Sequence, residues 1–208
     1  MEHIKKGHLP QVKGLILAGG RSTRMGQDKG LIEWHGRPQR EYLADMLQTL
    51  GIETCISCRP DQAPEMSSRP LLLDRYSDLG PLGAVASAFS ENPTAAWLVV
   101  ACDMPLLDAG TILHLLEMRR PDFAGTAFRS PAFPDGSPDP LLAIWEPKVV
   151  PVLHKYLLDG NYSARHVLMT AGVFLLDAPD PTVLTNVNNP SEVTWAKHYL
   201  TEFIHSDT

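Results

Sequence analysis

The segment AAWLVVACD at 95–103 constrains the fold most, because its apolar residues follow one another without a break up to Asp103. A strand of this kind is buried on both faces, which is typical of the centre of a parallel sheet. Before it, strands expected at 12–18, 53–58 and 71–74 alternate with helical patterns at 38–51 and 81–91. This alternation through the first 120 residues predicts a doubly wound parallel sheet with helices on both faces.

The second half of the chain continues with strands and helices in a less regular order. The pattern predicts a helix at 111–120, capped by Asp108 and basic in its last turn, and a closing helix at 191–203, capped by Ser191. Between them we expect strands at 123–128, 140–145 and 173–178, helices at 148–160 and 163–172, and an extended segment at 182–188. We therefore expect one three-layer α/β/α domain over 12–205, with a mostly parallel sheet, behind a flexible N-terminal segment, 1–11.

The charge and hydropathy of the chain argue against several classes of function. Its 208 residues carry a formal net charge of -6, which argues against a general nucleic-acid-binding role. No run approaches the roughly 18 apolar residues that a membrane span needs. The first residues are basic but lack the apolar core of a signal peptide. We therefore expect a cytoplasmic protein without nucleic-acid or membrane partners.

The three cysteines include the pair Cys55-x-x-Cys58. Such a pair could be a redox centre or half of a zinc site. However, side chains three apart on a strand point to opposite faces, and no second pair completes a metal site. With an odd number of cysteines and no export signal, we interpret them as ordinary thiols rather than disulfide partners.

The stretch LILAGGRSTRMGQDKG at 15–30 carries the strongest signal for a ligand. A strand that ends in Gly19 and Gly20 presents backbone N–H groups without obstruction by side chains. Arg21, Arg24 and Lys29 add positive charge in an acidic protein, which suits a polyphosphate. The stretch is neither a Walker A loop nor a dinucleotide-binding G-x-G-x-x-G. A solvated loop is the alternative, but its position after the first buried strand favours a site.

Asp103 follows the central strand directly and is a candidate metal ligand. A carboxylate at this rim of the sheet could hold Mg²⁺, which would bridge phosphate oxygens. The alternative is that Asp103 caps a turn, with Pro105 enforcing the bend.

Two further segments lie near the ends of strands and helices. DRYSDLGPLGA at 74–84 places Asp74 at the end of a strand, followed by a Gly-Pro turn into a helix. Such a helix N-terminus accepts an anion in some proteins and only packs in others. NVNNPSE at 186–192 is, by itself, an N-cap pattern for the closing helix.

The four motifs occur in the order found in the molybdenum cofactor guanylyltransferases (MobA-like), a family of the nucleotidyltransferase superfamily that the chain closely resembles. The pattern L-A-G-G-x-S-x-R-M-G-x-D-K, which resembles the family's opening signature, matches 17–29. The resemblance implies a Rossmann-like, GT-A-like fold, with Leu17, Ala18 and Gly19 at the nucleotide and Lys29 on its phosphates. Related cytidylyltransferases tend to carry Leu-Ala-Ala-Gly here, so Leu17-Ala18-Gly19-Gly20 favours guanine.

The resemblance also assigns the other site residues. It implies that Asp103 and Asn188 hold Mg²⁺, that Asn186 and Asn188 bind the pterin, and that Arg24, Lys29 and Asp103 carry catalysis. The remaining residues that it places at the nucleotide are Gly20, Ser57, Asp74, Gly80, Pro81, Leu82, Gly83 and Asp103. The chain departs from the family pattern at Ser57, where a family example has Asn, and at Asp139, where His or Gln often precedes Pro-Leu.

The activity implied by the resemblance is transfer of GMP from GTP to molybdopterin, or to its molybdenum-bearing form, with release of pyrophosphate. The implied cofactor is Mg²⁺, and the implied partners include molybdoenzymes or cofactor-delivery proteins. One alternative is another nucleotidyltransferase, which would use CTP with the same pterin or act on a sugar phosphate or similar small phosphate. The other is a nucleotide-binding module without turnover.

Overall fold

A single sheet runs through the molecule. The computed structural model describes residues 9–18, 29–63, 69–76 and 78–204 of the chain. In these residues seven strands form the sheet, in the order β3-β2-β1-β4-β6-β5-β7. The strands are β1 (Val12–Leu17), β2 (Thr54–Cys58), β3 (Leu71–Leu73), β4 (Ala96–Ala101), β5 (Gly125–Arg129), β6 (Pro138–Trp145) and β7 (Val173–Leu176).

The sheet is parallel except at β6. β1 pairs in parallel with β2 and β4, and β2 pairs in parallel with β3. β6 runs antiparallel between β4 and β5, and β5 pairs in parallel with β7. The predicted mostly parallel α/β fold is confirmed. The start of β6 therefore lies beside the carboxyl end of β4.

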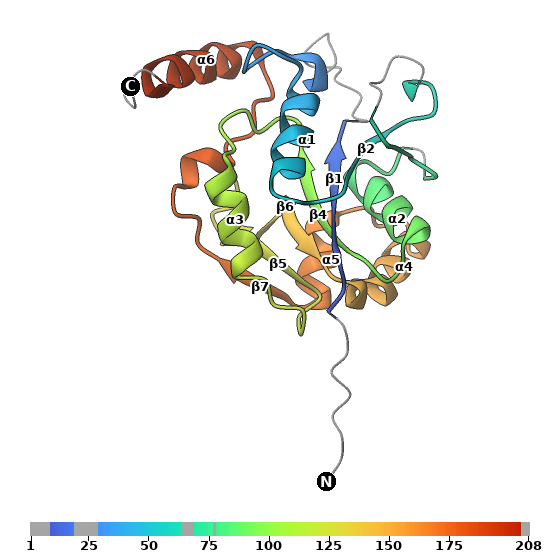
Figure 1. The fold of residues 1–208 in the computed structure, drawn as a ribbon. Coiled ribbons are helices and arrows are strands. Elements are labelled where there is room, and N and C mark those ends of the chain that lie inside the picture. The colour runs from blue at the N-terminus through green and yellow to red at the C-terminus, as the bar shows by residue number, and fades with distance from the viewer. Residues whose placement is uncertain (1–8, 19–28, 64–68, 77, 205–208) are drawn as a thin grey trace.

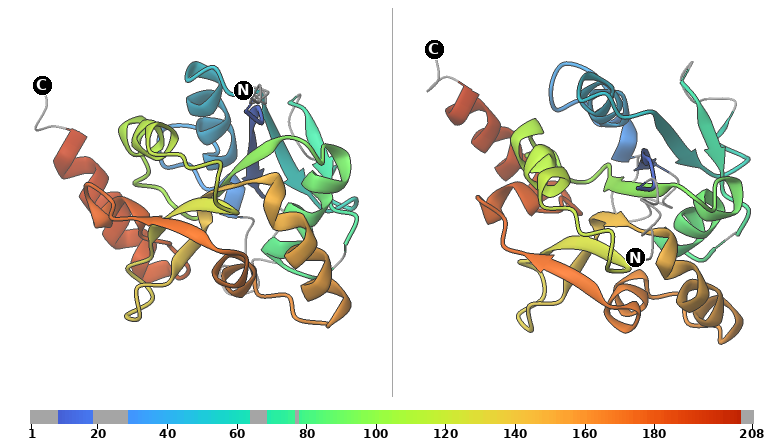
Figure 2. Two further views of the ribbon diagram at one scale, coloured as in Figure 1. Left: turned by 90° about the horizontal axis from the view of Figure 1, so that it is seen from below. Right: turned by 60° about the horizontal axis from the view of Figure 1, so that its bottom comes forward.

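Helices cover both faces of the sheet and give the molecule three layers (Figures 1 and 2). α1 (Gln39–Thr49) and α3 (Ala109–Glu117) pack on one face, and α2 (Pro81–Glu91), α4 (Val150–Leu158) and α5 (Ala164–Ala171) pack on the other. α6 (Pro190–Ile204) lies at the end of the molecule toward which the arrow of β1 points in Figure 1. Short 3-10 helices are η1 (Lys29–Leu31), η3 (Pro147–Val149) and η4 (Pro181–Leu184).

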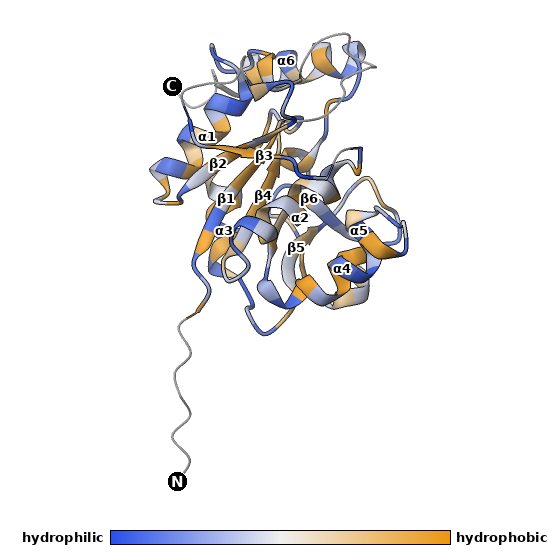
Figure 3. Ribbon diagram, turned by 90° about the vertical axis from the view of Figure 1, so that its right-hand side faces the viewer, coloured by the Kyte–Doolittle hydropathy of each residue, from blue (hydrophilic) through white to orange (hydrophobic). Residues whose placement is uncertain are grey.

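The core explains why the sequence pattern locates the central strands well. All six residues of β4 are buried, as expected for a strand that is apolar on both faces. Alternate residues of β4 enter two apolar clusters, one beneath α1 and α3 and the other beneath α2, α4 and α5. The strands of the parallel half are accordingly drawn mainly in the hydrophobic colour in Figure 3.

The predicted helix at 111–120 begins directly after its predicted cap, Asp108, but ends earlier than predicted. α3 begins at Ala109 after Asp108, whose side chain accepts a hydrogen bond from the backbone N–H of Thr111 at 2.6 Å, so the predicted cap is confirmed. The helix ends at Glu117, and the basic residue Arg119 lies beyond it. Its Nε donates to Glu146 Oε1 at 2.6 Å and its Nη2 donates to Oε2 at 3.0 Å. Arg119 therefore stabilises a buried carboxylate instead of the helix dipole.

Two predictions near the C-terminal helix are also corrected. The segment expected to be extended at 182–188 begins within η4, because Asp180 caps this turn through a 2.8 Å hydrogen bond from the Thr182 N–H. The cap of α6 is Asn189 rather than Ser191. Asn189 Oδ1 accepts a hydrogen bond from the Glu192 N–H at 3.0 Å, and a proline follows Asn189 as the first helical residue.

The predicted limits of the flexible N-terminal segment, 1–11, and of the domain, 12–205, extend beyond the described residues at both ends of the chain. Residues 1–8 of the predicted flexible segment lie outside them, as do 205–208. Within the described part of that segment, the Gln11 carbonyl accepts a hydrogen bond from the Ala96 N–H at 2.9 Å. In the described ranges, no helix combines the length and the hydropathy needed to cross a membrane.

Candidate functional site

The carboxyl ends of β1, β2 and β4 meet at one edge of the sheet. The Ala18 N–H donates to the Ser57 carbonyl at 3.1 Å, and the Cys102 N–H donates to the Leu17 carbonyl at 3.4 Å. These bonds hold Leu17 and Ala18, which are predicted to contact the nucleotide, between the segments that carry Ser57 and Asp103. Because Ala18 is only 4% exposed and packs in the core, a nucleotide would contact its backbone rather than its methyl group.

The glycine-rich stretch after β1 is described only at its two ends. Gly19, Gly20 and Arg24 lie outside the described residues, so their roles stay predictions. The description resumes at Lys29, the first residue of η1. Its side chain is not described, and its role at the phosphates also stays a prediction.

Asp74 and Ser57 form a hydrogen-bonded pair beside the ends of β3 and β2. Ser57 is 1% exposed, and its hydroxyl donates to Asp74 Oδ1 at 2.5 Å. Burial raises the pKa of Asp74, while the hydrogen bond from Ser57 and the charge of Arg59 oppose this rise. Ser57 thus orients Asp74, and the half-buried Asp74 is the more accessible of the two.

The turn before α2 depends on glycine at two positions. Gly80 has φ 58°, a conformation that disfavours other residues. At Gly83, an added Cβ would lie 2.6 Å from the Tyr76 carbonyl oxygen, so the chain after Asp74 packs directly on the first turn of α2. Leu82 is fully buried, and Pro81 occupies the first position of the helix. The positive end of the α2 dipole therefore lies close to the segment that follows Asp74.

Asp103 and the segment 186–188 come together although they are far apart in the sequence. The Val187 N–H donates to the Asp103 carbonyl at 2.7 Å. Asp103 Oδ1 and Asn186 Oδ1 are both buried, and the Asn186 oxygen accepts no hydrogen bond from the described residues. The Asn188 N–H donates to Glu192 Oε2 at 2.6 Å, which attaches the segment to α6. The structure thus brings together the residues predicted at the metal and at the pterin.

Two residues with no predicted role hold the turn after Asp103. Gln39 is fully buried, and its Nε2 donates to the Met104 carbonyl at 3.1 Å. The His35 ring nitrogen Nε2 hydrogen-bonds to the Pro105 carbonyl at 3.0 Å, and the ring stacks on Tyr42 at 3.8 Å between centroids. Burial lowers the pKa of His35, so the ring is neutral at neutral pH. The signal in the sequence is a polar Gln at the start of a helix whose other buried residues, apart from Arg40, are apolar.

The cysteines behave as ordinary thiols. None forms a disulfide, and Cys55 packs against the cluster beneath α2, whereas Ile56 and Cys58 point to the other face of β2. Burial raises the pKa of the Cys55 thiol to about 11, which makes it a poor nucleophile and metal ligand at neutral pH.

The oxygen donors at this edge fit a magnesium ion. Within the described ranges, no three His, Cys, Asp or Glu side chains cluster as a metal site. Asp103 offers a carboxylate and Asn188 an amide oxygen. Mg²⁺ is usually bound by one or two carboxylates, with substrate phosphates and water completing its shell. The donor set therefore fits Mg²⁺ better than it fits a closed zinc site.

Known relatives are similar to this chain in sequence over most of its length. The MobA-like NTP transferase domain family matches residues 14–173. A molybdenum cofactor biosynthesis bifunctional protein from Synechocystis is 28% identical over 181 residues, 86% of this chain and 52% of that protein. The chain thus spans about half the length of that relative. A molybdenum cofactor guanylyltransferase from Pseudomonas paraeruginosa is 32% identical over 201 residues, 92% of this chain and 96% of that protein.

A solved structure shows the same fold. The crystal structure of molybdopterin-guanine dinucleotide biosynthesis protein A from Archaeoglobus fulgidus matches with a TM-score of 0.73, over 91% of this chain and 99% of that one. At 18% identity this likeness shows the fold alone. The match to the family over 14–173 is independent of it. The chain therefore belongs to the MobA-like nucleotidyltransferase family.

Proposed function

We propose that this protein transfers GMP from GTP to molybdopterin, or to its molybdenum-bearing form, and releases pyrophosphate. The observation that carries the proposal is the 2.7 Å hydrogen bond from the Val187 N–H to the Asp103 carbonyl, which joins the predicted nucleotide and pterin segments. Family membership and relatives named molybdenum cofactor guanylyltransferases support it.

In the proposed reaction, a terminal phosphate oxygen of the pterin attacks the α-phosphate of GTP and forms a new P–O bond. The bond from the α-phosphate to the oxygen bridging it to the β-phosphate breaks, and its electron pair leaves with pyrophosphate. The attacking oxygen is already ionised, so the protein needs no general base. Positioning and neutralisation of charge are then its main contributions.

On the nucleotide side, the proposal uses the backbone at the end of β1 and the loop that follows it. Leu17 and Ala18 would contact the nucleotide, and the N–H groups of Gly19 and Gly20 would lie near it. Arg24 and Lys29 would bind the triphosphate. Asp74, oriented by Ser57, would contact the nucleoside, and the turn at 80–83 would lie beside it.

At the metal, Asp103 and Asn188 would supply oxygen ligands. Members of this family are generally metal-dependent. When bound, Mg²⁺ would supply positive charge that offsets the negative charge of the phosphates during transfer. Because Asp103 Oδ1 is buried, its charge is screened less by water than that of a surface carboxylate.

On the pterin side, Asn186 is the best-supported contact. Its buried Oδ1 accepts no hydrogen bond from the described residues. Leaving a buried acceptor without a donor costs about 1–3 kcal/mol. The ring N–H and amino groups of a pterin are donors that would satisfy this oxygen.

The experiment that tests the proposal is pyrophosphate release with each nucleoside triphosphate, Mg²⁺ and a choice of acceptors. We expect release that requires both GTP and molybdopterin. Release with CTP and molybdopterin would indicate a cytidylyltransferase, and release with a sugar phosphate would indicate a different acceptor. GTP binding without release for any acceptor would indicate a binding module without turnover.

A further inference from the structure

The turn at 103–105 is held at three consecutive carbonyl groups by donors from two segments that are far away in the sequence. Each carbonyl accepts one hydrogen bond: Asp103 from the Val187 N–H at 2.7 Å, Met104 from Gln39 Nε2 at 3.1 Å, and Pro105 from His35 Nε2 at 3.0 Å. The bonds restrain successive peptide planes, beginning with the plane that follows the Asp103 Cα atom. They therefore act on the part of the main chain from which the Asp103 side chain leaves.

Gln39 donates from a firmly held part of the molecule. It is the first residue of α1, which packs on the sheet through buried apolar residues such as Leu43 and Leu47. Its own N–H donates to the Ile32 carbonyl at 3.1 Å, and its side chain is fully buried. The Met104 carbonyl is thus held from a fixed point on a helix.

Stability alone does not explain a glutamine at this position. Gln39 Oε1 is buried and accepts no hydrogen bond from the described residues. A buried acceptor without a donor typically costs more than one neutral hydrogen bond contributes. The Met104 carbonyl also accepts from the Leu107 N–H at 3.4 Å, so it would keep a partner without Gln39. An apolar side chain of similar length, such as methionine, would therefore suit the fold at least as well.

We propose that Gln39 is a positioning residue, which fixes the main chain after Asp103 and so sets the direction of the Asp103 carboxylate at the proposed cation. The inference rests on the proposed function, because it takes Asp103 as a ligand of that cation. A misplacement of about 1 Å, even one caused away from the reacting atoms, can cost about 100-fold in rate. A hydrogen bond that adds nothing to stability can therefore still be needed for transfer.

The test compares the parent with Gln39→Met, which keeps the length of the side chain and removes its donor. In pyrophosphate release at saturating Mg²⁺, kcat should fall about 10- to 100-fold. The KM for GTP should change much less, because Gln39 does not touch the nucleotide in this proposal. Thermal unfolding should give a Tm at or above the parental value. A loss of kcat together with a lower Tm would show a structural role and overturn the inference.

Thr126 supplies the matched control. It is fully buried in β5, and its Oγ1 accepts a hydrogen bond from the Arg120 N–H at 2.9 Å. The strand registers place Thr126 and Leu98 on either side of Ile144, five residues before Asp103 along the chain. Thr126→Val removes the buried acceptor, so it should lower Tm and keep the parental kcat. An equal loss of kcat in this variant would show that turnover responds to any lost buried hydrogen bond, which overturns the inference.

Mn²⁺ affinity gives a readout that does not depend on transfer. Mn²⁺, a paramagnetic substitute for Mg²⁺, is titrated into the whole chain, and the free ion is measured by electron paramagnetic resonance. Affinity should fall about 10-fold in Gln39→Met and at least as much in Asp103→Asn. Thr126→Val should bind Mn²⁺ as the parent does.

The same titration separates this inference from the proposed function. Parental affinity in Gln39→Met, with reduced affinity in Asp103→Asn, overturns the role of Gln39 and leaves the proposed function standing. Parental affinity in Asp103→Asn shows that the cation ligand is misassigned, which removes both the inference and the proposed metal site. Reduced affinity in both variants, with no pyrophosphate release by the parent for any acceptor, overturns the proposed function and supports the role of Gln39 at the cation.

Discussion

Asp103 is the residue at which substitution should separate folding from catalysis most clearly. Its main-chain carbonyl, not its side chain, accepts the hydrogen bond from Val187. Asp103→Asn should therefore keep the fold and lower kcat/KM by about 100-fold or more, because the cation loses a charged ligand. Pyrophosphate release and circular dichroism measure the two effects.

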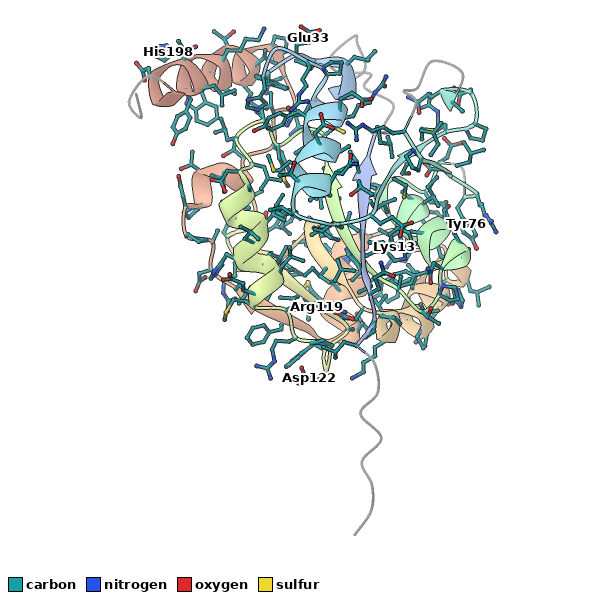
Figure 4. The ribbon with its side chains drawn as sticks, in the orientation of Figure 1. Lys13, Glu33, Tyr76, Arg119, Asp122 and His198 are labelled. Carbon is teal, nitrogen blue, oxygen red and sulfur yellow. The ribbon has the colours of Figure 1, made fainter. Side chains whose placement is uncertain are left out.

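The matched control for this substitution is Asp122→Asn. Figure 4 shows Asp122 at the opposite end of the molecule from Glu33 and His198, and its side chain is exposed. This variant should keep parental kcat/KM. Near-parental turnover of Asp103→Asn at saturating Mg²⁺ would remove the role assigned to Asp103.

Asp74 should make the stability of the protein depend on pH. Burial raises its pKa in the folded state, so ionisation destabilises the folded protein as the pH rises through the raised pKa. Asp74→Asn cannot ionise. The free energy of unfolding of this variant, minus that of the parent, should therefore be larger at about pH 7 than at about pH 4, near the ordinary pKa of aspartate.

Urea denaturation at the two pH values measures this difference. Asp122→Asn is again the control, because hydrogen bonding to Arg120 lowers the pKa of Asp122. For this variant, the free energy of unfolding minus that of the parent should change little between the two pH values, and it should be smaller at about pH 7 than at about pH 4. A difference for Asp74→Asn that stays constant or shrinks toward neutral pH would contradict the account of this pair.

At the scale of elements, α2 should depend on the missing side chain of Gly83. Its added Cβ would lie 2.6 Å from the Tyr76 carbonyl oxygen. To make room, the main chain at Gly83 or at Tyr76 must shift. Gly83→Ala should therefore lower the free energy of unfolding by about 1–3 kcal/mol. In a chain of this size, each kcal/mol lowers Tm by about 2–4 °C.

Gly110 in α3 offers a matched control for Gly83. Its added Cβ would have its nearest contact at 3.4 Å, with Asp108 Oδ1. Gly110→Ala should therefore be neutral or stabilise by up to about 1 kcal/mol. Equal Tm values for the two alanine variants would show that the turn before α2 is not tightly packed.

Helices and strands could be predicted from the sequence where their buried residues form a regular pattern along the chain. β4 is buried at every position, and its apolar run shows this directly. The place of β6 between β4 and β5 could not be predicted in this way. Which strands pair depends on contacts between distant segments, and these contacts produce no repeating pattern within one segment. The cap of α6 is ambiguous in the sequence, because Asn189 and Ser191 are both residue types that cap helices. Pro190 decides between them, since it suits the first helical position.

For the whole molecule, the motifs identified the segments that meet at this edge of the sheet but not the contacts that hold them together. Asp103 and Asn188 come from motifs at strand and helix ends, and the structure brings their segments together. Gln39 supports the site from a helix, and only the three-dimensional arrangement shows its bond to the Met104 carbonyl. The roles of residues that act through packing or strand pairing are harder to predict from a sequence than the roles of residues in a motif.

The proposed activity joins a guanine nucleotide to the pterin. The most direct measurement is the mass of the product formed from molybdopterin, Mg²⁺ and an equimolar mixture of GTP and CTP. We expect a pterin product carrying GMP in at least ten-fold excess over the CMP product, a preference of about 1.4 kcal/mol. A product carrying mainly CMP, or a pterin recovered without any nucleotide, would contradict it.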